Sequence, residues 1–207
     1  MSNERTEHWQ QVYATKGSDA VSWYRPHLDT SLRLLERAGL GAGSRLIDVG
    51  GGASTLVDDL LARGLTAVTV LDIAKSALDA ARQRLGARAE AVTWLAGDVT
   101  RVALPAAAYD LWHDRAVLHF LVDPADVTAY VAQVRRALAP GGHAVIGGFA
   151  GDGPERCSGL PVARRDAADI AALLGAGFEL LHAEREAHVT PWGAPQAFAY
   201  ALLRKSA

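Results

Sequence analysis

Aspartates stand at the ends of three predicted strands, next to the glycines that matter most for ligand binding. Asp48 precedes three successive glycines (Gly50, Gly51 and Gly52), and Asp72 and Asp98 end the next two apolar runs. A glycine turn lets a ligand press against main chain where a Cβ would collide. The carboxyl ends of parallel strands share one edge of a sheet. We therefore expect a rim that accepts hydrogen bonds from sugar hydroxyls and amino groups.

The position of Asp48 selects between two adenosine-containing ligands. A carboxylate two residues before Gly50 is unfavourable beside a diphosphate but suits an ammonium group. The dinucleotide fingerprint is also incomplete, because Thr55 stands where its third glycine should be. S-Adenosylmethionine is thus favoured over NAD. Further donor-binding residues are expected after each strand and share the same rim: Ser54 as a helix cap, Asp72 with Ile73 at the ribose, and Asp98 with Val99 at the adenine.

A second polar group follows the predicted fourth strand. His113 and Asp114 are adjacent and would face opposite sides of a strand, and His119 lies about one helical turn beyond Arg115. If the bound ligand is S-adenosylmethionine, Asp114 and Arg115 are expected near this donor and the acceptor that reacts with it, with His119 and His113 as candidate bases. A structural histidine remains the alternative for each. A base is needed only when the acceptor holds its proton tightly.

Two further segments are predicted to cover the rim. Residues 1–28 form an aromatic cap in which Trp9 and Tyr13 share one face of a helix, with Tyr13 toward the substrate. Trp23, Tyr24 and Arg25 are expected to fold over the donor, with an aromatic face near the sulfonium and Arg25 near its carboxylate. The loop 150–165, which contains Arg156 and Cys157, is a candidate lid and substrate pocket. Packing without a chemical role is the alternative for Cys157.

Strands and helices alternate along the chain, which favours a parallel sheet covered on both faces. The last two strands have no helix between them and predict an antiparallel hairpin. Predicted strands span 45–49, 67–72, 91–96, 109–114, 143–149, 178–188 and 196–203. Predicted helices span 29–38, 55–63, 74–85, 124–138 and 167–174, apart from the N-terminal helix.

Composition restricts the class of protein. The 207 residues are half apolar and carry a net charge of −2, which fits one domain over 1–207 and disfavours nucleic-acid binding. One cysteine and no tight ligand spacing argue against disulfides and metal. The sequence has no apolar run long enough to predict a membrane span. We expect a cytoplasmic protein, monomeric or weakly dimeric.

Taken in their order along the chain, these motifs resemble those of the class I S-adenosylmethionine-dependent methyltransferases. The resemblance rests on Asp48-x-Gly50-x-Gly52, Asp72, Asp98, Tyr109–Trp112 and Leu138–His143. It implies a doubly wound α/β sheet of seven strands in the order 3-2-1-4-5-7-6, with S-adenosylhomocysteine as product.

A narrower resemblance concerns the acceptor. Asp114–Leu118 is similar to a signature of thiopurine methyltransferase-like enzymes, with Ala116 in place of a glycine. This favours a small-molecule acceptor: a thiol, another soft nucleophile or an amine. The aromatic N-terminus is also similar to that of small protein-lysine methyltransferases, so a protein substrate is the alternative. A donor-binding regulator without activity is a third interpretation, and an NAD-dependent reductase is the least favoured.

Overall fold

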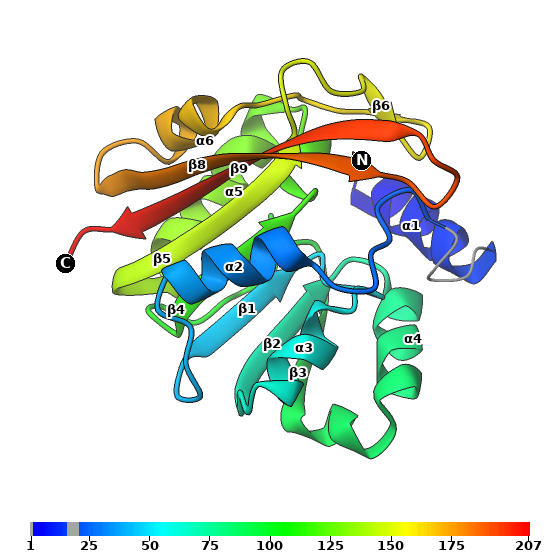
Figure 1. The fold of residues 1–207 in the computed structure, drawn as a ribbon, viewed down its shortest axis with the longest axis horizontal. Helices are drawn as coiled ribbons and strands as arrows, with labels where there is room; N and C mark the ends of the chain where they lie inside the picture. Colours follow the sequence, from blue (N-terminus) through cyan, green and yellow to red (C-terminus); the bar gives the residue numbers. More distant parts are fainter. Residues whose placement is uncertain (1, 16–20) are drawn as a thin grey trace.

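A twisted sheet of seven strands forms the centre of a computed structural model that describes residues 2–15 and 21–207 (Figure 1). Its order is β3-β2-β1-β4-β5-β9-β8. A separate two-stranded hairpin, β6-β7, accounts for the shift in numbering from the predicted order, which is confirmed. The strands are β1 (Arg45–Val49), β2 (Ala67–Asp72), β3 (Val92–Ala96), β4 (Tyr109–Arg115), β5 (Leu138–Phe149), β6 (Arg156–Cys157), β7 (Leu160–Pro161), β8 (Phe178–Val189) and β9 (Pro195–Lys205).

The first five strands of the sheet are parallel, and both faces of its central strands are buried. In β1, Leu46 packs into the cluster on one face while Ile47 packs into the cluster on the other. Such two-sided burial requires a nearly continuous apolar run, which is how this strand reads in sequence. Asp48 pairs in register with His113 of β4, so these two polar side chains share a face.

Helices cover the two faces in separate groups (Figure 1). Helices α2, α3 and α4 pack on one face, and α5 and α6 pack on the other. Helix α1 lies beside the edge where the parallel strands end. The helices are α1 (Ser2–Thr15), α2 (Asp29–Arg37), α3 (Leu56–Ala62), α4 (Lys75–Leu85), α5 (Pro124–Ala137) and α6 (Ala167–Leu174), with 3₁₀ turns η1 (Gly86–Ala91) and η2 (Leu118–Phe120).

The predicted terminal hairpin is confirmed, because β9 runs antiparallel to both β5 and β8. Two details differ from the sequence predictions. β5 begins at Leu138, directly after α5, and the register with β4 shifts at residues 139–142, where a turn alone was expected. Helix α3 begins at Leu56 with Thr55 at the cap position, while Ser54 Oγ accepts a hydrogen bond from the Leu56 amide at 3.2 Å.

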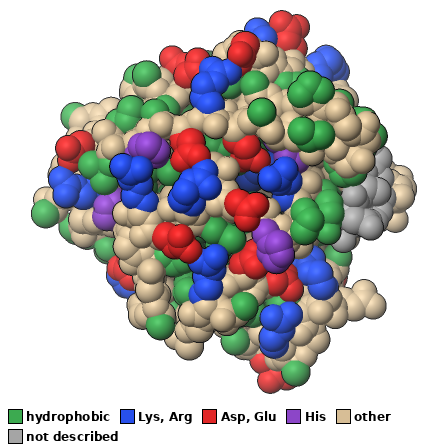
Figure 2. Space-filling view, in the orientation of Figure 1, with side chains coloured by type: hydrophobic (Ala, Val, Ile, Leu, Met, Phe, Trp, Pro, Cys, Tyr) green, Lys and Arg blue, Asp and Glu red, His purple; other side chains and the backbone are tan. Residues whose placement is uncertain are grey.

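Charges of both signs are intermingled on the face shown in Figure 2. Many charged side chains of the protein are paired, for example Arg45 with Asp110 and Arg84 with Asp58. Within the described part of the chain, no helix has both the length and the apolar character needed to cross a membrane.

Candidate functional site

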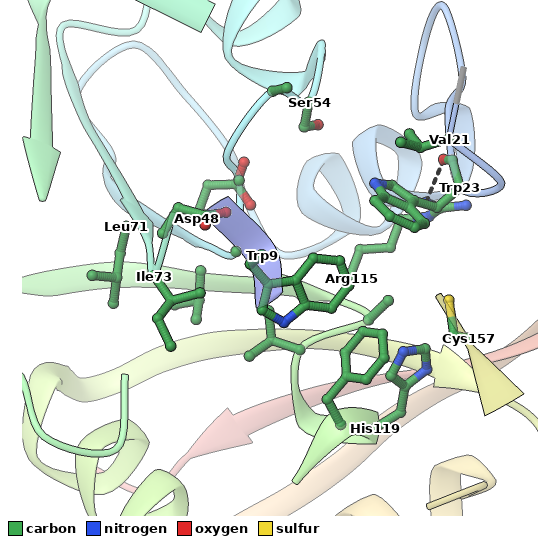
Figure 3. A pocket seen from close by; sticks show the side chains of 18 of the residues that line it. Trp9, Val21, Trp23, Asp48, Ser54, Leu71, Ile73, Arg115, His119 and Cys157 are labelled. Atoms are coloured by element: carbon green, nitrogen blue, oxygen red, sulfur yellow. Dashed lines mark hydrogen bonds between the residues drawn. The ribbon is translucent and has the colours of Figure 1, made fainter. Parts of the chain in front are cut away.

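A cavity of about 1270 Å³, counting its open mouth, lies where the parallel strands end (Figure 3). Helix α1 and residues 21–28 form further walls. The sequence-predicted residues that line it are Tyr13, Trp23, Tyr24, Arg25, Asp48, Gly50, Gly51, Ser54, Asp72, Ile73, Asp98, Val99, His113, Arg115, His119 and Cys157; Gly52, Asp114 and Arg156 do not line it.

The glycine turn after β1 leaves no room for side chains. Gly50 has φ +70°, and a Cβ there would lie 2.0 Å from Val117 Cγ2. At Gly51 a Cβ would lie 2.4 Å from Asp48 Oδ2. Gly52 has φ +30° and sits against the Asp72 carboxylate, behind the cavity wall. Gly50 and Gly51 therefore place bare main chain and the Asp48 carboxylate beside the cavity.

Asp48 is buried and only half satisfied. Its Oδ1 lies 2.7 Å from His113 Nδ1, and His113 Nε2 lies 2.9 Å from Ser31 Oγ. Its Oδ2 is buried and has no hydrogen-bond partner among the described residues. An acceptor without a donor is costly when buried, so this oxygen is suited to a ligand with N–H groups. Here His113 orients a carboxylate, which differs from the predicted role as a base.

Asp72 ends β2 on the same rim. Its Oδ1 accepts from the Ala74 amide at 2.7 Å. Burial raises the pKa of this carboxyl to about 7, although the Ala74 amide acts against the shift. Burial also raises the pKa of the Tyr13 hydroxyl, and the nearby Asp72 charge adds to this effect. We call the part of the cavity formed by Asp48, Asp72 and Ile73 the β2 side.

Asp98 follows β3 and joins the rim to α1. Its Oδ2 accepts from Arg5 at 2.9 Å, and its Oδ1 accepts from the Thr100 amide and hydroxyl. Burial tends to raise the pKa of Asp98, but hydrogen bonds from Thr100 and the Arg5 charge hold it below its ordinary value. Arg5 also pairs with Asp126 at 2.9 Å. No motif marked Arg5 among the many arginines of the sequence.

Asp114 points away from the cavity, so the expectation that it takes part in catalysis does not fit its position. Its carboxylate accepts from the Tyr130 hydroxyl at 2.6 Å and from the amides of Val117 and Leu118 at 2.8 and 3.1 Å. Burial raises its pKa to about 6. The carboxylate holds the turn after β4, where Ala116 has φ +76°. As predicted, His113 and Asp114 face opposite sides of the strand.

Arg115 and His119 do line the cavity, and with Cys157 they form what we call the β5 side. Arg115 donates from Nε to the Tyr200 hydroxyl and from Nη1 to the Trp23 carbonyl, each at 3.0 Å. His119 is buried and accepts at Nδ1 from an amide of β5. Burial and the Arg115 charge lower its pKa to about 3. A base this weak removes protons poorly near neutral pH, which argues against the predicted role of His119.

The aromatic residues of the N-terminal segment meet over the cavity. The ring of Trp9 lies 5.7 Å from Trp23 and 4.9 Å from Phe120, both nearly perpendicular to it. Tyr13 lies 6.3 Å from Trp23. Figure 3 shows Trp9 between Asp48 and Ile73 on one side and His119 and Cys157 on the other. This packing joins α1, residues 21–28 and the turn after β4.

The loop 150–165 contributes one wall through the β6-β7 hairpin. Cys157 is buried and lines the cavity, whereas Arg156 is exposed and bonds the Gly159 carbonyl. Of these two residues expected at the substrate pocket, only Cys157 therefore lines the cavity. The Ala163 amide fixes the loop to the His119 carbonyl at 2.8 Å.

Several lining residues were not predicted as site residues. They share no local motif, and only the folded sheet brings them together: Arg5, Phe120, Phe149, Gln196 and Phe198. Phe149 and Phe198 are register partners across β5 and β9, which requires knowledge of the hairpin register. No group of three or more metal-ligand side chains occurs among the residues that the structure describes.

Comparisons with known proteins agree with this architecture. Residues 46–142 match a family described as a methyltransferase domain. Malonyl-[acyl-carrier protein] O-methyltransferase of Serratia marcescens is 35% identical over 114 residues, which are 55% of this chain and 42% of that protein. The eEF1A lysine and N-terminal methyltransferase of Mus musculus is 26% identical over 144 residues, 69% of this chain and 20% of that protein. The chain thus spans less than half the length of these relatives.

A solved structure extends the likeness to the whole chain. The Burkholderia thailandensis 1,6-didemethyltoxoflavin-N1-methyltransferase, with its namesake ligand and S-adenosylhomocysteine bound, has a TM-score of 0.76. The match covers 100% of this chain and 91% of that one at 22% identity. At this identity the likeness establishes the fold.

Proposed function

Since the chain belongs to the class I S-adenosylmethionine-dependent methyltransferase superfamily, we propose that it transfers a methyl group from S-adenosylmethionine to a small-molecule acceptor. The observation that carries the proposal is the buried, unpartnered Asp48 Oδ2 beside a glycine turn that has no space for side chains. A cationic ligand held against main chain satisfies both features at once.

The β2 side has the chemistry to hold this donor. Asp48 Oδ2 would accept from the ammonium group, and Asp72 from the ribose hydroxyls. Asp98 and Val99 would contact the adenine. Trp23 would place its ring near the sulfonium, where a π-face is favourable for a cation.

When bound, the donor supplies a methyl group whose bond to sulfur breaks as the acceptor's lone pair forms the new bond, with the electron pair left on S-adenosylhomocysteine. The chain's residues position the acceptor and exclude water. His119 is a poor base, and Asp114 lies outside the cavity. Acceptors that release a proton easily are therefore favoured, such as a thiol, whose ordinary pKa is about 8.5.

Enclosure supports a small acceptor over a protein side chain. Helix α1, the Trp23 segment and the β6-β7 hairpin each contribute walls to the cavity. A lysine acceptor is the alternative, because the murine relative is named as a lysine methyltransferase. Incubation with methyl-labelled donor, once with a metabolite extract and once with lysate proteins, separates the two. Label found only in macromolecules would reject the small-molecule acceptor.

Donor class is tested first by calorimetric titration with S-adenosylhomocysteine and with NADH. We expect saturable binding of S-adenosylhomocysteine and none of NADH at matched concentrations. Saturable binding of NADH alone would overturn the proposed function.

A further inference from the structure

Two hydrogen-bond donors on the β5 side lack partners in the part of the chain that the structure describes. His119 Nδ1 accepts the Phe149 amide proton at 3.3 Å, so in the neutral ring the proton lies on Nε2. That Nε2 is buried and has no partner among residues 2–15 and 21–207. The ring is only 3% exposed and lines the cavity. His119 is thus a fixed donor of one hydrogen bond toward a ligand.

Arg115 supplies the second donor. Its Nε and Nη1 are used by Tyr200 and Trp23, but Nη2 is buried and has no partner in the described chain. The guanidinium carbon lies 4.6 Å from the centre of the Phe198 ring, which fixes its plane. With two of its nitrogens and one of its faces held, the remaining nitrogen is preorganised for a ligand acceptor.

Within residues 2–15 and 21–207, no carboxylate neutralises this cation directly. Among the described residues Arg115 forms no salt bridge; Glu186 reaches it only through the Tyr200 hydroxyl, which donates to Glu186 at 2.8 Å. Asp48 and Asp72 belong to the β2 side. A partly buried cation with no counter-ion among the described residues favours an anion and disfavours a second cation.

From these contacts we infer that the acceptor is a flat, apolar molecule bearing an oxyanion, such as a carboxylate, which Arg115 Nη2 and His119 Nε2 bind together. The inference rests on the proposed function and names the substrate class. The aromatic rings of Trp9 and Phe120 provide the walls for the flat body. Charge-assisted bonds from guanidinium and imidazole are the strong kind for a carboxylate. The cationic side chain of lysine fits this environment poorly.

The test compares three probes of the same size and different charge: benzoate, benzamide and benzylamine. Each is titrated by ligand-observed NMR into the protein saturated with S-adenosylhomocysteine. We expect benzoate to bind about tenfold more tightly than either other probe, as for a charge-assisted hydrogen bond. Equal binding of benzamide, preference for benzylamine, or no benzoate binding at about 10 mM would each overturn the inference.

Variants tie the preference to the two residues. Arg115→Gln should lower benzoate affinity about tenfold and leave benzamide unchanged. His119→Asn should lower it several-fold, since the shorter amide can still accept from the Phe149 amide but cannot replace Nε2. If Arg115→Gln does not fold, His119→Asn decides alone. Arg204→Gln, an exposed change on β9 away from the cavity, is the matched control.

Because the protein is first saturated with S-adenosylhomocysteine, the experiment distinguishes failure of the proposed function from failure of this inference. If the parent protein does not bind S-adenosylhomocysteine, the proposed function is overturned, and this inference with it. Binding of S-adenosylhomocysteine without a preference for benzoate overturns the inference alone.

Discussion

The β2 side and the β5 side of the cavity are built in different ways. The β2 side takes its polar groups, Asp48 and Asp72, from the ends of two adjacent strands, and each lies within two residues of a strand end. The β5 side combines Arg115, His119 and Cys157 with Trp9 and Phe198, from five separate segments of the chain. One side is set by local sequence, and the other depends on tertiary packing.

This difference has a physical origin in the sheet. Parallel strands must end at one edge, so residues after β1, β2 and β3 converge whatever lies between them. The β5 side instead depends on where α1, the 21–28 segment and the β6-β7 hairpin pack. Those segments can vary without disturbing the parallel core. We therefore expect substitutions on the β2 side to affect donor binding strongly, and those on the β5 side to affect acceptor choice.

Gly51→Ala gives the largest expected effect. The added Cβ would lie 2.4 Å from Asp48 Oδ2 and 2.8 Å from Val70 Cγ1. Overpacking of this kind costs about 1–3 kcal/mol, and we expect S-adenosylhomocysteine affinity to fall up to about 100-fold by calorimetry. At Gly43 an added Cβ meets no described atom within 4 Å, so Gly43→Ala is the control. Affinity within about threefold of the parent would show that the turn tolerates a side chain.

The sequence predicted the β2 side better than the β5 side. Strands β1 and β2 match their predicted bounds, because apolar runs between turn residues leave few alternatives. Asp114 shows the limit: its place in a motif suggested chemistry, but strand alternation turned it toward Tyr130. Arg5 and Phe198 carry no local signal at all. Their positions depend on helix docking and hairpin register, which a single sequence does not specify.

Asp72→Asn should reduce donor affinity about tenfold and remove its pH dependence. With the Asp72 pKa raised to about 7 by burial, the carboxylate that accepts ribose hydroxyls is fully formed only above that pH. In the parent protein, S-adenosylhomocysteine affinity at pH 6 should be about tenfold lower than at pH 8. Asp79→Asn, on the exposed side of α4, is the control.

Ionisation of Asp72, which should favour donor binding, should destabilise the unliganded fold. A carboxyl whose pKa is raised by folding stabilises the protein fully below its unfolded value near 4, and this contribution is lost as pH rises toward 7. The free energy of unfolding of Asp72→Asn, measured with urea, should therefore increase relative to that of the parent as the pH rises from 4 to 7. A constant difference across that range would contradict a raised pKa.

Trp23→Leu tests whether the aromatic cap belongs to the β2 side as well. If the ring faces the sulfonium, loss of a cation–π contact should weaken S-adenosylmethionine about fivefold. The uncharged S-adenosylhomocysteine should change less, which separates charge recognition from general packing. Trp192→Leu alters a tryptophan that is 64% exposed in the terminal hairpin and serves as control. Equal losses for both ligands would assign Trp23 a packing role.

Arg5→Gln gives the smallest expected effect and tests how the two sides are joined. Arg5 anchors α1 to Asp98 and Asp126, while Trp9 of the same helix packs on Phe120. Partly exposed ion pairs contribute about 0.2–1 kcal/mol each, so amide exchange in residues 4–15 should accelerate about threefold. Arg63→Gln removes an exposed ion pair between α2 and α3 and should leave that exchange unchanged. Unchanged exchange in Arg5→Gln would mean that the other contacts of α1, the packing of Trp9 on Phe120 and the hydrogen bond from the Ser76 amide to Gln10 Oε1, hold the helix without these ion pairs.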